Sequence, residues 1–178
     1  MGIKQAFALT ACWMIFCFAK VNPSVKEKER INWITLKEVN LKFKTESKPV
    51  LIDLFTDWCY WCKVMDKKTY NNPKVIAYIN THFYAVKVDA ETKSQLLWNE
   101  KKYDYNTDNK INEFALYVTQ GQLGFPTTVI FPDVKKAPAA IPGYMNAREI
   151  EEVLKYFGEG NYKSESFESF SAKFKSTW

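Results

Sequence analysis

The sequence is poor in the residues and patterns on which several common architectures depend. It has one histidine, His82, and four cysteines, whereas a zinc site usually needs four ligands. The longest mostly apolar run, residues 6–19, has fourteen residues and is short for a membrane-spanning helix, which needs roughly 20. Neither a repeat period nor a tract of biased composition is visible. These shortages argue against a metal centre, a repeat fold and a low-complexity chain.

Charge of one sign is not concentrated anywhere in the chain. The formal net charge is +5, from 25 basic and 20 acidic residues, and basic runs such as residues 26–30 (KEKER) are interleaved with acids. No clustered basic stripe or base-reading motif is present, so we expect no nucleic-acid partner. Apolar residues are abundant, at 47% hydrophobic and 16% aromatic, and in 178 residues they suffice for one ordinary domain with a packed core.

The first nineteen residues are typical of a secretory signal. A lysine precedes the apolar run, and Cys17 and Ala19 offer small side chains at the two positions that a signal peptidase inspects. We therefore predict a signal peptide over residues 1–19, a linker over residues 20–30, and an exported, periplasmic protein. Two alternatives stay open: a lipoprotein signal ending at Cys12, and an uncleaved N-terminal membrane anchor.

The scarcity of cysteine is the most informative shortage. With two cysteines in the predicted signal, the exported chain keeps only Cys59 and Cys62. A pair three residues apart closes almost no loop, so it adds little stability and is expected to serve chemistry. It stands where an apolar run of strand length, residues 50–55, passes into a helix-forming segment, residues 59–69. Cys59 is thus expected at a helix N-terminus, where unpaired N–H groups and the helix dipole favour its thiolate.

This placement predicts a role for each sulfur. In such motifs the pKa of the leading thiol falls to about 3.5–7.5, which leaves a thiolate at neutral pH. We expect Cys59 to be an exposed nucleophile that attacks a client disulfide, and Cys62 to attack the sulfur of Cys59 and release the reduced client. Three alternatives stay open: an inert disulfide, a metal site that includes His82, and a hydrolase that pairs Cys59 with His82. His82 itself is expected at the start of a strand, as an ordinary surface or edge residue.

The rest of the chain alternates strand and helix patterns. Two capping boxes are predicted, Thr35 with Glu38 and Asn146 with Glu149, and the proline of Lys48-Pro49 is expected to end the first helix. The expected strands are residues 32–34, 50–55, 83–88, 127–131 and 139–144. The expected helices are those opened at Thr35 and Asn72 and those over residues 59–69, 111–118 and 147–157, with a hairpin over residues 96–105 that turns at Asn99-Glu100. Strand, helix and strand in succession predict a parallel crossover and an α/β fold.

The chain is expected to divide into one domain and a short extension. Residues 31–158 hold all the strand patterns and form the predicted domain. Residues 159–178 are predicted to be a C-terminal helical extension that packs on the domain, because four aromatic side chains recur there at helical intervals.

Residues 50–63 (VLIDLFTDWCYWCK) resemble the strand, active site and helix of the thioredoxin superfamily in order and spacing. Residues 68–70 (KTY), 72–75 (NPKV) and 124–127 (GFPT) fit the same pattern. Within the superfamily, the chain is most similar to the C-terminal periplasmic domain of the bacterial thiol:disulfide interchange reductase. The resemblance implies a thioredoxin fold, with a central mixed β-sheet flanked by helices and an insertion, residues 91–123, before the cis-proline loop.

The resemblance also implies roles by position. Pro126 corresponds to the family's cis-proline, and the backbone of Phe125 before it is implied to pair with a client strand. Asp53 matches the family's buried carboxylate beneath the second cysteine, where burial raises the pKa and suits the group to shuttle a proton. Lys87 matches the usual partner of that carboxylate. Trp58 is expected to shield the site and shape the client surface.

Together these observations predict a thiol–disulfide oxidoreductase that acts on protein clients without an organic cofactor or a metal. An electron-donating thiol partner must reset the pair, and such donors are often membrane proteins. Tyr60 and Trp61 stand where thioredoxin has Gly-Pro, so the prediction of a reductant rests on the resemblance alone. A redox-inactive binding or holdase module is the alternative. The insertion either selects clients or elaborates the surface.

Overall fold

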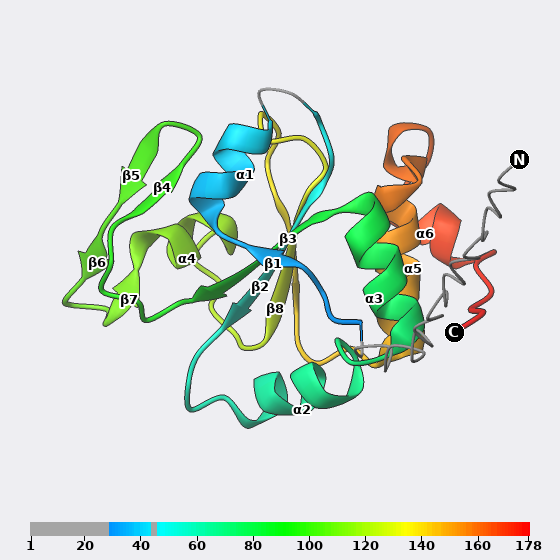
Figure 1. Cartoon of the computed structure of the whole chain (residues 1–178), viewed down its shortest axis with the longest axis horizontal. Helices are drawn as coiled ribbons and strands as arrows, with labels where there is room; N and C mark the ends of the chain where they lie inside the picture. Colours follow the sequence, from blue (N-terminus) through cyan, green and yellow to red (C-terminus); the bar gives the residue numbers. More distant parts are fainter. Residues whose placement is uncertain (1–28, 44–45) are drawn as a thin grey trace, which may run out of the picture.

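The computed structural model describes residues 29–43 and 46–178. Its centre is a five-stranded sheet in the order β1-β3-β2-β8-β9, in which β1, β3 and β2 are parallel and β8 runs antiparallel to both of its neighbours. The strands are β1 Trp33–Ile34, β2 Val50–Phe55, β3 Tyr84–Asp89, β8 Thr127–Phe131 and β9 Ala139–Pro142. Helices lie on both sides of this mixed sheet (Figure 1), which confirms the predicted α/β class.

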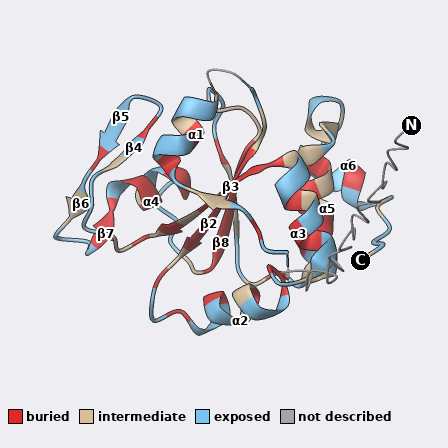
Figure 2. Cartoon of the chain, viewed as in Figure 1, coloured by how far each residue is buried: buried red, intermediate tan, exposed pale blue. Residues whose placement is uncertain are grey.

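The sheet separates two hydrophobic cores, because alternate residues of a strand point to opposite faces. Leu51 of β2 belongs to one core and Ile52 to the other, so β2 is buried on both faces, as its uninterrupted apolar sequence predicts. One core is covered by α2 Tyr60–Lys68, α3 Pro73–His82 and α5 Ala147–Gly158; the other is covered by α1 Leu36–Lys42, α4 Glu113–Val118, β4 Leu96–Trp98 and β5 Lys101–Tyr103. Figure 2 shows the buried residues concentrated in the central strands and on the inward sides of the helices.

The helix starts follow the predicted caps. Thr35 and Glu38 form a capping box at α1, Asn146 and Glu149 form another at α5, and Asn72 caps α3. The predicted end of the first helix is wrong, because α1 stops at Lys42, well before Pro49. A proline fixes only the last residue at which a helix can end, and this helix ends earlier.

The insertion is partly a core element rather than only a surface elaboration. The predicted hairpin is confirmed, and its turn residues Asn99 and Glu100 both have positive φ, as a tight two-residue hairpin turn requires. The helix predicted over residues 111–118 begins two residues late, because Ile111–Asn112 form strand β7 against β6 Tyr105–Asn106. Three aromatic side chains of the insertion are buried in the core on the α1 side of the sheet: Trp98, Tyr103 and Phe114.

The C-terminal extension packs on the domain, but only part of it is helical. A 3₁₀ turn, η1 Asn161–Lys163, leads to α6 Phe167–Ser171, whose Phe170 is buried against Tyr156. The predicted helical spacing fails further on, since Trp178 lies beyond the helix and packs edge-on against Tyr78. The buried carboxylate of Glu151 on α5 binds the last three residues through their N–H and O–H groups.

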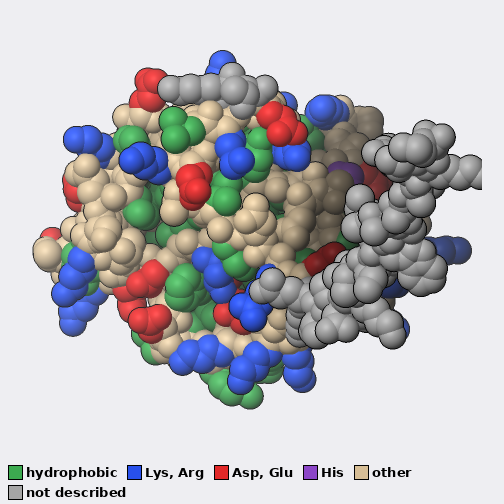
Figure 3. Space-filling view, in the orientation of Figure 1, with side chains coloured by type: hydrophobic (Ala, Val, Ile, Leu, Met, Phe, Trp, Pro, Cys, Tyr) green, Lys and Arg blue, Asp and Glu red, His purple; other side chains and the backbone are tan. Residues whose placement is uncertain are grey.

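The predicted signal peptide and residues 20–28 of the predicted linker lie outside the described residues. Among the helices of residues 29–43 and 46–178, none combines the length and the apolar character needed to span a bilayer. On the face drawn in Figure 3, basic and acidic side chains are interspersed, as the sequence predicts.

Candidate active site

Cys59 and Cys62 form a disulfide at the point where β2 passes into α2. Cys59 is the N-cap of α2, and its sulfur accepts a hydrogen bond from the N–H of Cys62 at 3.0 Å. That N–H is one of the groups at a helix start that have no partner within the helix. The sulfur of Cys59 therefore occupies the position where a helix N-terminus stabilises negative charge.

The disulfide lies below a rim of exposed aromatic side chains. Trp58, Tyr60 and Trp61 are 65%, 69% and 54% exposed, whereas Cys59 and Cys62 are 4% and 5% exposed. The expectation of an exposed leading sulfur is thus wrong for this oxidised form. The side chains beside and between the cysteines take most of the solvent contact in this segment.

The cis-proline loop meets this rim from the other side. The Phe125–Pro126 peptide bond is cis, as expected from the resemblance. The ring of Phe125 makes an edge contact with that of Trp58, with 5.9 Å between centroids. The indole N–H of Trp58 in turn donates to Oε1 of Glu91 at 3.0 Å. The structure thus brings Trp58, Phe125 and Pro126 together, and adds Glu91, which carries no signal in the sequence.

Asp53 and Lys87 also lie together, as predicted. They are direct neighbours in the register of β2 and β3, and Nζ of Lys87 lies 3.2 Å from Oδ2 of Asp53. Lys87 forms a second ion pair with Asp66 on α2 and stands over the rings of Trp33 and Phe55 at 5.4 Å and 5.2 Å. The lysine is therefore held between two carboxylates and two aromatic faces.

The protonation of Asp53 follows from this environment. Burial raises the pKa of Asp53 to about 6, Lys87 opposes the rise, and the charge of Asp66 adds to it. A carboxyl with a pKa near 6 both gives and takes a proton near neutral pH. Sequence reasoning missed Asp66, although its position one helical turn after Cys62 places it on the same side of α2.

His82 lies elsewhere. It is the last residue of α3 rather than the start of a strand, because the helix opened at Asn72 continues for ten residues. Its ring stacks on that of Tyr78 with centroids 4.2 Å apart. Among residues 29–43 and 46–178, no three histidine, cysteine, aspartate or glutamate side chains are grouped so as to hold a metal ion.

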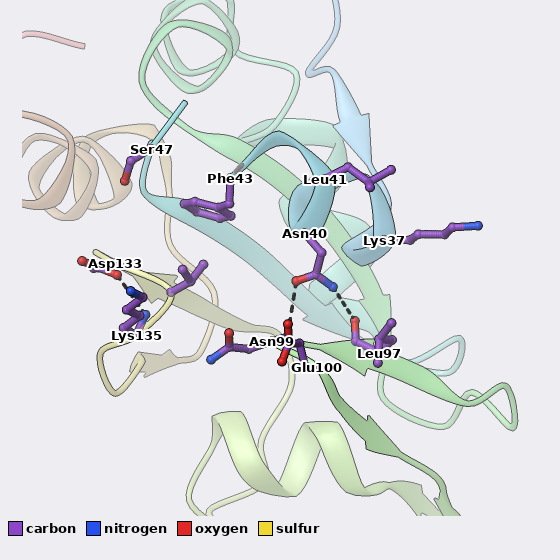
Figure 4. A pocket seen from close by; sticks show the side chains of 11 residues that line it. Lys37, Asn40, Leu41, Phe43, Ser47, Leu97, Asn99, Glu100, Asp133 and Lys135 are labelled. Atoms are coloured by element: carbon purple, nitrogen blue, oxygen red, sulfur yellow. Dashed lines mark hydrogen bonds between the residues drawn. The ribbon is translucent and has the colours of Figure 1, made fainter. Parts of the chain in front are cut away.

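A cavity lies apart from the disulfide, between α1 and the turn of the β4–β5 hairpin (Figure 4). It measures about 620 Å³ and has the exposed Leu41 and Leu97 among its lining residues. The Asn40 amide donates to the carbonyl of Leu97 at 3.0 Å and accepts from the N–H of Asn99 at 3.3 Å, and so ties the hairpin to α1. This groove contains neither cysteine nor any predicted site residue, so size alone does not mark the reactive centre.

Comparison with known proteins agrees with the fold. Residues 24–157 match the family model Thioredox_DsbH, described as "Protein of unknown function, DUF255". The thiol:disulfide interchange protein DsbD of Salmonella typhi is 26% identical over 152 residues, which cover 82% of this chain and 24% of that protein. The chain spans between 11% and 24% of the length of the curated relatives it matches.

Solved structures share the fold. A thioredoxin-fold protein from Helicobacter pylori superposes with a TM-score of 0.55 at 23% identity, covering 71% of this chain and 79% of that one. A structure described as DsbH oxidoreductase superposes with a TM-score of 0.53 at 17% identity, covering 80% and 92%. The predicted thioredoxin fold is therefore confirmed.

Proposed function

The chain belongs to the Thioredox_DsbH family of thioredoxin-like proteins, and from this premise we propose that it is a thiol–disulfide oxidoreductase that acts on protein clients. One observation carries the proposal: a closed Cys59–Cys62 disulfide with its first sulfur at the N-cap of α2. A disulfide between cysteines three positions apart adds little stability to a fold, whereas a thiolate at the start of a helix is a nucleophile. The relatives named thiol:disulfide interchange protein DsbD support the same chemistry.

The reaction runs in two exchanges. In the reduced protein, the Cys59 thiolate attacks a client disulfide, forms a mixed disulfide and expels one client thiolate. Cys62, as a thiolate, then attacks the sulfur of Cys59 and expels the second client thiolate. The client gains two electrons, which the two cysteines lose as they form the disulfide, and each expelled thiolate takes a proton.

Asp53 and Lys87 are proposed to serve the second exchange. Cys62 must lose a proton before it attacks, and a carboxylate with a pKa of about 6 takes up a proton near neutral pH. Lys87 fixes the position of that carboxylate through its contact of 3.2 Å. Asp53 and Lys87 lie on adjacent central strands, so their placement is rigid.

Trp58, Phe125 and Pro126 are proposed to bind the client. Among the described residues, the N–H and C=O of Phe125 have no hydrogen-bond partner, and Phe125 lies just before β8. Unpaired peptide groups beside a sheet bind an extended peptide by adding a strand. Trp58, held by Glu91, shields the disulfide on one side of this peptide.

The direction of transfer and the setting are parts of the same proposal. We place the protein in the periplasm as a reductant, with residues 1–19 as export signal or anchor, residues 20–30 as linker, residues 31–158 as the redox domain and residues 159–178 as its extension. A thiol partner, which is membrane-bound in this proposal, supplies the electrons. The name of its DsbD relatives supports thiol–disulfide interchange, while the direction of transfer and the residue boundaries rest on the sequence and its resemblance.

The test is insulin reduction by the full chain together with the reduction potential of the pair. Cys59→Ser is expected to lower the rate to the uncatalysed level, and Cys62→Ser to trap a mixed disulfide with the client. The matched control replaces the other two cysteines, Cys12 and Cys17, by serine and is expected to keep full activity. A reduction potential of about −270 mV supports a reductant, and one of about −120 mV reverses the direction.

An insulin rate that survives Cys59→Ser contradicts the proposal. Absence of turnover in the unmodified protein, with binding of unfolded insulin chains retained, identifies a holdase instead. The exposed rim of Trp58, Tyr60 and Trp61 is the surface such a module would use.

A further inference from the structure

We propose that Tyr70 and Thr128 are positioning residues for Asp53, and that their two buried hydroxyls hold one water molecule against its carboxylate. The proposal deepens the function proposed above and rests on the role given there to Asp53. That role needs a carboxylate that is charged before it takes up a proton, and a hydrogen-bond donor favours the charged form. Lys87, the donor seen in the structure, is shared with Asp66. A second donor to Asp53 therefore has a chemical purpose.

Thr128 stands directly beside Asp53 in the sheet. The two residues are paired in the antiparallel register of β2 and β8. Their side chains point to the same face, because Leu51 and Ile130, each two positions away, both belong to the core under α2, α3 and α5. Directly opposed residues of antiparallel strands have Cβ atoms about 4.5–5.5 Å apart. The buried hydroxyl of Thr128 is therefore near the Asp53 carboxylate.

Tyr70 reaches the same place from the end of α2. Its N–H donates to the carbonyl of Met65 at 3.0 Å, and its ring makes an edge contact with that of Trp33, with 5.2 Å between centroids. Burial raises the pKa of Tyr70 well above its usual value, the charge of Asp53 adds to the rise, and the Thr128 hydroxyl opposes it. Both groups therefore lie close to the phenol oxygen.

The two hydroxyls lack the same thing, a hydrogen-bond partner. Tyr70 and Thr128 are 5% and 0% exposed, and neither hydroxyl oxygen has a partner among the described residues. Buried hydroxyls in folded proteins are almost always paired, with protein or with water. Both oxygens lie near one carboxylate without a bond to it, so a small polar molecule between the three groups would satisfy all of them. Water is such a molecule, since a buried water makes about three hydrogen bonds to otherwise unpaired polar groups.

The three groups decide how this water bonds. The charged carboxylate of Asp53 only accepts, so the water donates one O–H to it. A hydroxyl both donates and accepts, so the water donates its second O–H to one hydroxyl and accepts from the other. Because the water donates to the carboxylate, it favours the charged form and opposes the effect of burial. Loss of either hydroxyl leaves the water with two partners instead of three and loosens its hold on Asp53.

The test is a carboxyl ¹³C NMR titration of Asp53 in the oxidised full chain, where the cysteine pair does not titrate. Tyr70→Phe and Thr128→Val each remove one hydroxyl and keep the shape of the side chain. Each is expected to move the pKa of Asp53 upwards by about 0.5–1 pH unit relative to wild type. The double variant is expected to shift it no further than the larger single change, because both hydroxyls hold the same water. Lys87 and Asp66, the charged groups that act on Asp53, are kept in every variant.

The matched control is Tyr103→Phe. Tyr103 is 4% exposed, but it belongs to the core on the α1 side of the sheet, opposite to Tyr70. Loss of its hydroxyl removes a buried phenol O–H of the same kind at a distance from Asp53. It is expected to leave the pKa of Asp53 unchanged.

A kinetic readout connects the water to the second exchange. The reduced full chain, with Cys12→Ser and Cys17→Ser so that only the pair reacts, is mixed with Ellman's disulfide. Thionitrobenzoate is released in two phases, and the second reports the attack by Cys62. The pH midpoint of that phase is expected to rise in Tyr70→Phe by the same amount as the pKa of Asp53.

A pKa of Asp53 that is unchanged in both Tyr70→Phe and Thr128→Val overturns the water site. Additive shifts in the double variant overturn it too, because they indicate two separate bonds rather than one shared water. A kinetic midpoint that does not follow the pKa overturns the positioning role. In each of these cases, two-phase release from Ellman's disulfide leaves the oxidoreductase standing. No release of thionitrobenzoate overturns the oxidoreductase and, with it, the positioning role.

Discussion

Two buried carboxylates in this molecule have opposite acidities. Asp53 is 2% exposed on the central strand β2, and Glu151 is 0% exposed on α5 and bonded to the C-terminal residues. The pKa of Asp53 is raised to about 6, while that of Glu151 is lowered to about 2. Burial is shared by both groups, so it does not explain why their pKa values move in opposite directions.

The number of hydrogen-bond donors around each carboxylate explains why the two pKa values move in opposite directions. The Glu151 carboxylate accepts from Ser176, from the N–H groups of Thr177 and Trp178 and from the Thr177 hydroxyl, at 2.6–3.0 Å, and pairs with Lys155 at 2.8 Å. Burial alone would raise the pKa of Glu151, and these hydrogen bonds outweigh it.

Among the described residues, Asp53 has one donor to its carboxylate, Lys87, which is itself shared with Asp66. The Glu151 carboxylate, with all these donors, holds the C-terminal residues against α5. The Asp53 carboxylate, with one shared donor, can exchange a proton near neutral pH.

The largest expected change in stability comes from replacing Glu151. Glu151→Gln is expected to lower the free energy of unfolding at pH 7 by about 2–4 kcal/mol, because the amide turns an N–H₂ towards donors and Lys155 loses its carboxylate partner. Denaturant unfolding measures the loss. Glu152→Gln, the next residue on α5, has a carboxylate oxygen without a hydrogen-bond partner among the described residues and serves as the control, with no loss expected.

The pH dependence of this loss has a definite sign. The folded pKa of Glu151, about 2, lies below the ordinary value of 4.5, so the unfolded chain binds more protons between these limits. The contribution of Glu151 is therefore complete above pH 4.5 and disappears as the pH falls towards 2. A difference between wild type and Glu151→Gln that stays constant across this window would contradict the account.

Asp53→Asn is expected to change stability in the opposite direction. The folded pKa of about 6 lies above the ordinary 3.8, so the folded protein binds more protons between these values and its stability falls as pH rises through them. Removal of the carboxylate should raise the free energy of unfolding at pH 7.5 by about 1–3 kcal/mol and have little effect near pH 4. Asp57→Asn, an exposed neighbour, is the control. Destabilisation at pH 7.5 would mean that the pairing with Lys87 outweighs the burial.

Asp53 and Glu151 also differ in how well their environments could be predicted from the sequence. An aspartate inside the run of residues 50–55 conflicts with its apolar neighbours, and a lysine on the adjacent strand offers the partner, so Asp53 and Lys87 follow from local pattern and resemblance. Glu151 sits on an amphipathic helix in the same way as any solvated glutamate. Its burial depends on residues 25 to 27 positions later in the chain, which no local pattern encodes.

The same distinction holds across the fold. The strands of the sheet, both capping boxes and the cysteine pair at a helix start depend on short-range rules and are predicted to within a few residues. Glu91 against Trp58 and Tyr144 against Trp61 join segments 33 and 83 residues apart. Only the packed sheet brings these side chains together.

The smallest expected effect concerns the lysine that two carboxylates share. Asp66→Asn removes the negative charge that raises the pKa of Asp53 and leaves Lys87 to Asp53 alone. The pKa of Asp53 should then fall from about 6 towards 3.8, and the pH range over which stability declines should narrow. Because Asp66 is about half exposed, the change in unfolding free energy should stay below about 1 kcal/mol.

Carboxyl ¹³C NMR titration of Asp53 measures this shift directly. Lys87→Met, as the paired variant, is expected to move the same pKa upwards, since it removes the cation and leaves burial unopposed. The pKa of Glu151 reports whether either change acts at a distance, and it should stay at about 2 in both variants. A pKa of Asp53 that rises or stays fixed in Asp66→Asn would show that burial alone keeps the group protonated. The charge of Asp66 would then make no contribution to the raised pKa of Asp53.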